Sequence, residues 1–141
     1  MRVCTFFGHK DAPCQIEPAL KSALIELIET QKVTMFYVGN HGYFDSMVHR
    51  LLKQFKTVYP HIDYAVVLAY RPNNSDKYTD FSDTIYPDGL ETVPLKYAIV
   101  HRNYWMIEKA DYVITYVRHT FGDSSKFKEM AERKGKIVIS L

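Results

Sequence analysis

Hydrophobic residues in this chain form short continuous runs that alternate with segments of helical spacing. The run 3–7 is apolar throughout and predicts a buried strand. Apolar positions in 16–31 recur every three or four residues and predict a helix. The run 34–38 predicts the second strand, and an apolar stripe across 44–55 predicts a helix that ends before Pro60.

The second half of the chain continues this alternation. We expect a strand at 63–69, a helix at 94–109, a strand at 112–117, a helix that begins near Asp123 or Ser124, and a last strand at 137–141. The third strand shows no polar alternation, which is typical of parallel strands covered by helices on both faces. The pattern predicts an α/β fold, a three-layer Rossmann-like arrangement with a mainly parallel five-stranded sheet flanked by helices.

The segment 70–93 interrupts the alternation with prolines, asparagines and a glycine, and holds no clear apolar period. We expect a long loop that begins at the carboxyl end of a strand. Loops of this length inside compact domains tend to be functional, so this one is a candidate lid. The length of 141 residues fits one domain, 1–141.

Composition narrows the choice of partners. The formal net charge is +2, and the basic residues are scattered, so nucleic acid is not expected as the main partner. Strand-like residues begin at Val3, and no apolar stretch approaches the roughly 20 residues of a membrane span. We expect a soluble cytoplasmic protein without membrane contact, in which Cys4 and Cys14 are reduced.

Two glycine-bearing turns directly follow predicted strands. The first is Gly8-His9-Lys10-Asp11, and the second runs from Gly39 to Asp45. In an open α/β sheet, turns after neighbouring strands share one edge and face one crevice. These turns therefore indicate a ligand site.

The residue types in the turns suit an anionic ligand. Gly8 permits close approach of the backbone, and His9 and Lys10 offer donors. In the second turn the amides after Gly42 would hold phosphate, and Asp45 would accept from ribose hydroxyls. Neither the dinucleotide fingerprint nor the ATP phosphate-loop motif is present, so no bound cofactor is expected.

Arg102 is the other informative position. On a helix over 94–109, the residues Leu95, Ala98, Ile99, Trp105 and Met106 share one face, and Arg102 falls near its centre. A buried guanidinium needs an anion, supplied either by a protein carboxylate, with Asp45 the obvious candidate, or by a ligand. A purely structural pair, or an arginine reaching the edge, fits the periodicity equally well.

Metal and nucleophile chemistry receive less support. His9, Asp11, His41 and Asp45 would gather on one rim, but their spacing is not that of metal ligands, so no metal is expected. No serine lies in a nucleophile elbow, and Cys4 falls within a strand. Hydrolases with a serine or cysteine nucleophile are therefore not expected.

Three segments carry a family resemblance: Thr5 to Lys10, Phe36 to Asp45, and Arg102 to Asp111. Their order and spacing resemble a functionally uncharacterised bacterial branch of the SLOG superfamily. That superfamily joins the LOG phosphoribohydrolases with the Rossmann-like domain of DNA-processing protein A. The resemblance covers nearly the whole chain, and it implies a Rossmann-like parallel sheet with a site for nucleotides or nucleotide-derived ligands.

The resemblance to LOG enzymes is uneven. The helix around Arg102 is similar to their His-Glu-Arg-Lys helix, which implies a role for Arg102 in the nucleotide site. Their Pro-Gly-Gly-x-Gly-Thr-x-x-Glu segment corresponds to 117–126, which keeps one glycine and no matching glutamate. Thr120, Gly122 and Ser124 would still hold a phosphate, and Asp123 would be a shorter acid.

The leading expectation is that the protein binds a nucleotide or nucleotide-derived small molecule at the carboxyl edge of the sheet. The first alternative is a LOG-like nucleoside 5′-monophosphate phosphoribohydrolase using Arg102 and Asp45, and the second is single-stranded nucleic-acid binding. A homodimer through an exposed sheet edge is compatible with the fold. The expected ligand-binding residues are Gly8, His9, Lys10, Gly39, Asn40, Gly42, Phe44, Asp45, Tyr70, Arg102, Asn103, Thr120, Gly122 and Ser124.

Overall fold

The computed structural model describes residues 1–71, 82–119 and 122–141. Its strands are β1 (Arg2–Gly8), β2 (Val33–Val38), β3 (Asp63–Val67), β4 (Thr84–Ile85), β5 (Tyr112–Tyr116) and β6 (Ile137–Ser140). Its α-helices are α1 (Glu17–Glu29), α2 (Gly42–Val58), α3 (Ala98–Lys109) and α4 (Asp123–Arg133). All neighbouring strands pair in parallel, as expected of strands with continuous apolar runs. The predicted α/β, three-layer Rossmann-like fold is confirmed.

The number of strands differs from the sequence prediction, because the described residues form a sheet of six strands instead of five. The additional strand, β4, is only two residues long and lies inside the segment 70–93 that was expected to be a loop. Its ladder includes hydrogen bonds from the backbone N–H of Val66 to Asp83 O (2.8 Å) and of Leu68 to Ile85 O (2.9 Å). A strand this short has no periodicity of its own. Part of the expected lid, 72–81, lies outside the described residues.

The helix predicted at 94–109 also begins later than expected. Residues Leu95–Tyr97 form a 3-10 turn, and the α-helix starts at Ala98. Leu95, expected on the buried face, is therefore 74% exposed. Pro94 directly precedes this 3-10 turn, and its fixed φ suits the start of the turn. The other elements lie where the pattern predicts them, with their ends shifted by at most a few residues.

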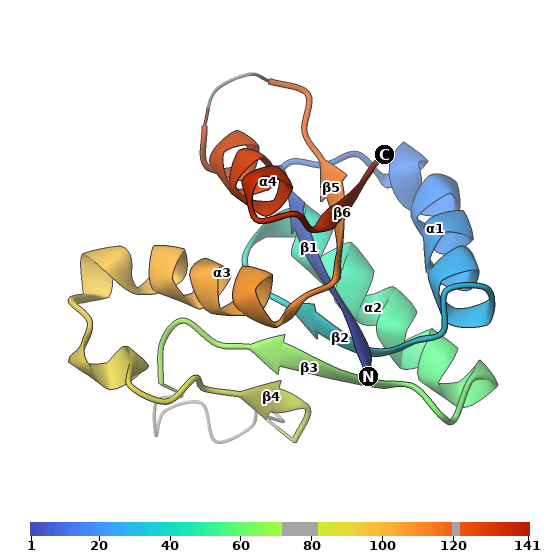
Figure 1. Ribbon diagram of the computed structural model, residues 1–141, viewed down its shortest axis with the longest axis horizontal. Helices are drawn as coiled ribbons and strands as arrows, with labels where there is room; N and C mark the ends of the chain where they lie inside the picture. Colours follow the sequence, from blue (N-terminus) through green and yellow to red (C-terminus); the bar gives the residue numbers. More distant parts are fainter. Residues whose placement is uncertain (72–81, 120–121) are drawn as a thin grey trace.

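Helices cover both faces of the sheet (Figure 1). On one face α1 and α2 enclose a core that includes Phe6, Phe36 and Phe44. On the other face α3 and α4 enclose a second core around Phe7 and Phe127, whose rings stack at 5.4 Å. Phe6 and Phe7 are neighbours in β1 and point to opposite faces, as the period of two in a strand requires.

The strand order is β4-β3-β2-β1-β5-β6, so β1 lies where the winding of the chain reverses. The chain proceeds from β1 through β2 and β3 to β4 on one side, and α3 then carries it to β5 on the other side. In doubly wound sheets the connections diverge at this position and leave a crevice beyond the carboxyl end of the strand. The first glycine turn, which follows β1, lies at this position.

In the ranges 1–71, 82–119 and 122–141, no helix is long and apolar enough to cross a membrane. No three His, Cys, Asp or Glu side chains there are grouped as metal ligands. Cys4 is buried and Cys14 is exposed, and both are free thiols.

Candidate functional site

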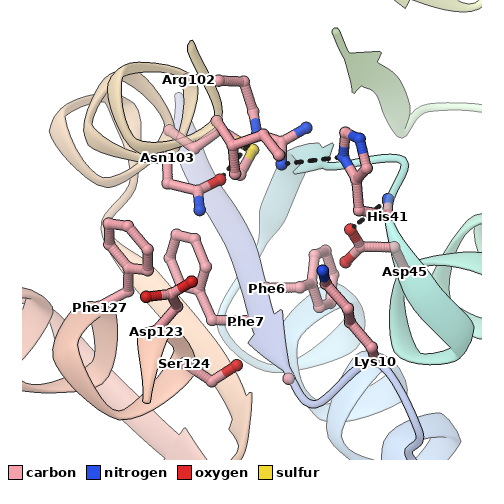
Figure 2. A pocket seen from close by; sticks show the side chains of 13 residues that line it. Phe6, Phe7, Lys10, His41, Asp45, Arg102, Asn103, Asp123, Ser124 and Phe127 are labelled. Carbon is pink, nitrogen blue, oxygen red and sulfur yellow. Dashed lines mark hydrogen bonds between the residues drawn. The ribbon is translucent and has the colours of Figure 1, made fainter. Parts of the chain in front are cut away.

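A cavity of about 110 Å³ lies beyond the carboxyl end of β1, between the start of α2, the middle of α3 and the start of α4. Figure 2 shows Arg102 and Asn103 on one side, His41 and Asp45 on the second, and Asp123 and Ser124 on the third. The lining residues are Phe6, Phe7, Gly8, Lys10, His41, Asp45, Ile99, Arg102, Asn103, Met106, Asp123, Ser124 and Phe127.

The two glycine turns are in direct contact at this edge. The backbone N–H of Tyr43 donates to the carbonyl oxygen of Lys10 at 2.7 Å. Gly42 has a φ of +89°, and a Cβ atom placed on it would lie 2.7 Å from the Cα of Lys10. A side chain at position 42 would therefore be strained and would separate the turns.

Glycines 8 and 39 also allow close packing around the cavity. A Cβ on Gly8 would lie 2.4 Å from the ring of Phe44, which is fully buried beneath the turn. A Cβ on Gly39 would lie 2.8 Å from Asp45 Oδ2 and 3.0 Å from Arg102 Nη1. The absence of a side chain at Gly39 leaves room for these two charged groups.

Arg102 is 2% exposed, as its position on the helix predicted, and its guanidinium is held by neutral acceptors. Nε donates to Asn103 Oδ1 at 2.7 Å, and Nη1 donates to Val67 O at 3.0 Å and to Asn40 Oδ1 at 3.3 Å. Nη2 lies 3.5 Å from His41 Nδ1 (Figure 2). These contacts fix the guanidinium at the cavity wall without neutralising its charge.

The expected direct pair between Arg102 and Asp45 does not form. Among the ion pairs of the described residues, none involves Arg102. Burial lowers the pKa of Arg102, and the nearby charge of Asp45 partly offsets this effect. A guanidinium nevertheless stays charged in proteins. The cavity is therefore bordered by a buried positive charge whose direct partners are all neutral.

Asp45 has an unusual environment for a carboxylate. Burial raises its pKa to about 6, although the backbone N–H of His41 donates to Oδ2 at 3.0 Å and Arg102 lies nearby. Burial, Arg102 and Lys10 lower the pKa of His41, which favours the neutral imidazole. A neutral His41 with its proton on Nε2 can accept at Nδ1 from Arg102, which is consistent with the lowered pKa.

The third side of the cavity is formed by the start of α4 and by Asn103. Gly122, with a φ of +94°, precedes this helix, and Asp123 and Ser124 in its first turn line the cavity. Because Asn103 accepts from Arg102 through Oδ1, its amide nitrogen points away from Arg102, to the side of Phe7 and Phe127 (Figure 2). This side can offer amide, hydroxyl and backbone donors to an anion.

The structure brings most of the predicted site residues to this edge. Six of them line the cavity: Gly8, Lys10, Asp45, Arg102, Asn103 and Ser124. Gly39, Asn40 and Gly42 support the lining residues, as described above. Phe44 does not line the cavity, because it is fully buried in the core beneath Gly8.

The other predicted residues lie around the rim. The ring of Tyr70 packs edge-on against His41, with centroids 6.1 Å apart. His9 turns toward β5, where its Nε2 accepts the backbone N–H of Arg118 at 2.8 Å. Gly122 begins α4 next to the cavity. Thr120 lies outside the described residues.

Several residues that line the cavity were not predicted from the sequence as ligand contacts. His41 was considered only as a metal ligand, although its place in the second glycine turn was a usable signal. Asp123 was considered only as an acid, and α4 brings it to the cavity wall. The apolar lining residues Phe6, Phe7 and Phe127 resemble other core positions in sequence, so no pattern separated them.

Comparison with known proteins gives evidence on the fold. No protein-family model matches the sequence, and no curated protein matches it at a significant level. Among solved structures, the chain is similar to DNA processing protein A from Streptococcus pneumoniae, with a TM-score of 0.68 and 15% sequence identity. The similarity covers 99% of this chain and 50% of the other, so the chain spans about half the length of that protein. The chain therefore has a Rossmann-like fold similar to that of DNA processing protein A.

Proposed function

We propose that this protein binds a nucleotide or nucleotide-derived small molecule, with a phosphate-bearing part in the cavity beyond β1. The observation that carries the proposal is Arg102, which is 2% exposed and has only neutral direct partners. Burying a charge without a direct ion-pair partner is costly, and the nearby Asp45 offsets the burial of Arg102 only in part, so an anion in the cavity would be favoured. Lys10, which also lines the cavity, adds a second positive charge.

The size of the cavity limits which part of the ligand it encloses. Sites for whole small molecules occupy about 300–1,000 Å³. The cavity of about 110 Å³ is smaller than that. It therefore suits a phosphate with an adjoining part of a sugar, and the rest of the ligand would extend outward.

Each side of the cavity has a role in this proposal. Arg102 and Lys10 neutralise the phosphate, and the first turn of α4 with Ser124 and Asn103 supplies hydrogen-bond donors. Asp45 accepts from ribose hydroxyls. These roles combine charge neutralisation with recognition of a sugar.

The proposal is tested by calorimetry with AMP, GMP, CMP, UMP, cyclic AMP, ADP-ribose, NAD and a short single-stranded oligonucleotide. We expect binding of at least one nucleotide, competition by inorganic phosphate, and about tenfold or greater weakening by Lys10→Ala and by Arg102→Gln. Because Lys10 is exposed, Lys10→Ala should fold normally. The test therefore stays valid even if Arg102→Gln fails to fold. Arg133→Ala, on the exposed end of α4, is the matched control.

Two results would oppose the proposal. One is that no small nucleotide binds the wild type. The other is that Lys10→Ala and a folded Arg102→Gln variant bind as tightly as the wild type. Binding of the oligonucleotide alone, weakening steeply with salt, would favour single-stranded nucleic-acid binding instead.

A second candidate is a LOG-like phosphoribohydrolase, and the carboxylates in the cavity favour it. Asp45 and Asp123 line the same space as Arg102. A group with a pKa of about 6, as in Asp45, suits proton transfer near neutral pH. In this reaction water would add to the ribose C1′, the N-glycosidic bond would break, and the base would leave protonated.

Chromatography of AMP incubated with the protein tests this activity. Free adenine and ribose 5-phosphate should appear in equal amounts, and Asp45→Asn and Asp123→Asn should each reduce the rate about 100-fold or more. Binding without release of any base from the nucleotides tested would leave the binding function alone.

A further inference from the structure

Two hollows continue outward from the cavity along the start of α2. The nearer one has a volume of about 280 Å³ and is lined by Lys10, Gly42, Tyr43 and Ser46. The farther one has a volume of about 570 Å³, and Tyr43 and Ser46 also belong to its walls. Lys10 lines both the cavity and the nearer hollow. The three spaces are therefore neighbours in series that share walls, and we call this series the path.

Tyr43 is the exposed aromatic side chain on this path. It is 70% exposed, although it lies in the first turn of a helix whose next residue, Phe44, is fully buried. Its backbone is fixed by the hydrogen bond from its N–H to Lys10 O at 2.7 Å. An aromatic ring on a fixed backbone next to a lysine can stack with a planar group, and it loses little entropy in doing so.

Ala12 and Met47 add apolar surface to the farther hollow, and Met47 can adapt its shape to a ring edge. Arg50 also lines this hollow, but it already pairs with Glu17. The carboxylate of Asp11 also lines the hollow and forms none of the ion pairs of the described residues, so the hollow offers apolar and aromatic contacts beside one negative charge and no unpaired cation. This chemistry differs from that of the cavity, where Arg102 and Lys10 lie.

We propose that the hollows form a base subsite in which the nucleobase of the bound ligand stacks on Tyr43. This inference rests on the proposed function, because it starts from a phosphate placed in the cavity beside Lys10. The cavity is too small for a sugar and a base together, so the base must leave it. The nearer hollow, which shares Lys10 with the cavity, has Tyr43 in its wall and is the place where we put the base. The ligand class is therefore a nucleoside 5′-phosphate in which one ribose separates phosphate from base.

The experiment compares ribose 5-phosphate with the tightest-binding of AMP, GMP, CMP and UMP. Calorimetry is done on the wild type, Tyr43→Ala, Tyr43→Phe and Lys10→Ala. Tyr97→Ala, at an exposed tyrosine away from the path, is the matched control. Because Tyr43 is largely exposed, its replacement should not change the unfolding midpoint, and thermal unfolding of each variant checks this.

We expect the mononucleotide to bind about tenfold or more tightly than ribose 5-phosphate. Tyr43→Ala should remove this advantage and leave ribose 5-phosphate binding unchanged, whereas Tyr43→Phe should retain it. Lys10→Ala should weaken both ligands. This pattern would locate the base on Tyr43 and the phosphate in the cavity.

Failure of the inference and failure of the proposed function give different results. If the wild type binds neither the mononucleotides nor ribose 5-phosphate, the proposed function fails, and the base subsite fails with it. If the wild type binds both equally, or Tyr43→Ala keeps the full affinity for the mononucleotide, only the base subsite is overturned. Loss of that affinity in Tyr70→Ala but not in Tyr43→Ala would also overturn it. The base would then lie beside Tyr70, which packs against His41, instead of on Tyr43.

Discussion

Asp45 lies beside Arg102 without contacting it, and this placement is costly to the fold. Its pKa is raised to about 6, mainly by burial, from an ordinary value of 3.8. The folded protein therefore holds this proton more tightly than the unfolded chain does. Above pH about 6 the ionised carboxylate destabilises the fold, and below pH about 4 this penalty is absent. A group kept at such a cost is expected to serve the site.

We predict that Asp45→Asn stabilises the protein at pH 8 and has little effect at pH 4. The pKa difference, discounted for partial exposure to the cavity, corresponds to about 1–3 kcal/mol in the free energy of unfolding. The amide oxygen that this substitution introduces would still accept the His41 N–H. Urea denaturation at the two pH values measures the effect, with the exposed Asp88→Asn as control. Equal or lower stability of Asp45→Asn at pH 8 would contradict the prediction.

At the scale of elements, side chains join segments that the sheet alone would not fix. His9 connects the turn after β1 with the segment after β5, since its Nε2 accepts the Arg118 N–H at 2.8 Å. Its ring also packs against Tyr116 and His119, with centroids 5.7 Å and 4.8 Å away. Burial, then His119 and also Arg118, lower the pKa of His9, while Asp11 acts in the opposite direction.

The connection through His9 should weaken in acid. The unfolded chain takes up a proton near the ordinary pKa of 6.5, whereas folded His9 favours the neutral form. Stability from this contact is therefore complete above pH 6.5 and decreases as pH falls below it. Urea denaturation should show a smaller loss of stability between pH 7.5 and 5.5 in His9→Gln than in the wild type or the exposed-site control His61→Gln. An unchanged pH dependence would count against this role.

Asp83 connects the short strand β4 to the rest of the fold. It accepts from His49 Nε2 at 2.8 Å and from Tyr64 OH at 3.0 Å. Although burial acts in the opposite direction, these hydrogen bonds hold the pKa of Asp83 below its ordinary value. A two-residue strand contributes few ladder bonds, so these side-chain bonds are a large part of its attachment.

We predict that Asp83→Ala loosens β4 locally. The amides of Val66 and Leu68, which donate to Asp83 O and Ile85 O, should exchange about tenfold faster with solvent hydrogen. The Leu141 amide, which donates to Thr115 O at the other edge of the sheet, is the internal control. Equal acceleration at both edges would indicate global destabilisation instead of local loosening.

For the whole molecule, the cavity is the place where β1, α2, α3 and α4 meet. A ligand held there would contact elements from both faces of the sheet. Because the unfolded chain has no such site, binding would stabilise the entire fold by mass action. This effect reports on the assembled site and not on any one residue.

A bound 5′-mononucleotide at about 100 times its dissociation constant should stabilise the wild type by about 2.7 kcal/mol. For a domain of this size that corresponds to an increase of about 5–10 °C in the unfolding midpoint. Lys10→Ala, for which we expect affinity at least about tenfold lower, should show about half of this increase or less at the same concentration, whereas Arg133→Ala should show the full increase. Thermal unfolding measures the midpoints. Equal increases in Lys10→Ala and the wild type would place the ligand elsewhere.

Much of this architecture could be predicted from the sequence, because burial leaves a local pattern. Continuous apolar runs placed five of the six strands, and helical spacing placed Arg102 on a buried face. β4 could not be predicted, since two residues show no periodicity and their pairing depends on β3. Leu95 was wrongly expected to be buried, because periodicity cannot tell a 3-10 turn from the first turn of an α-helix.

The sequence by itself determined that the two glycine turns follow parallel strands and that a cation lies on an inward helix face, since both follow from local spacing. Only the tertiary structure decided that Arg102 contacts Asn40, Asn103 and the Val67 carbonyl and makes no direct pair with Asp45. Tertiary structure also decided the size of the cavity and brought α4 to its wall. The physical reason is that these contacts join residues distant in sequence, and their distances depend on how strands and helices pack.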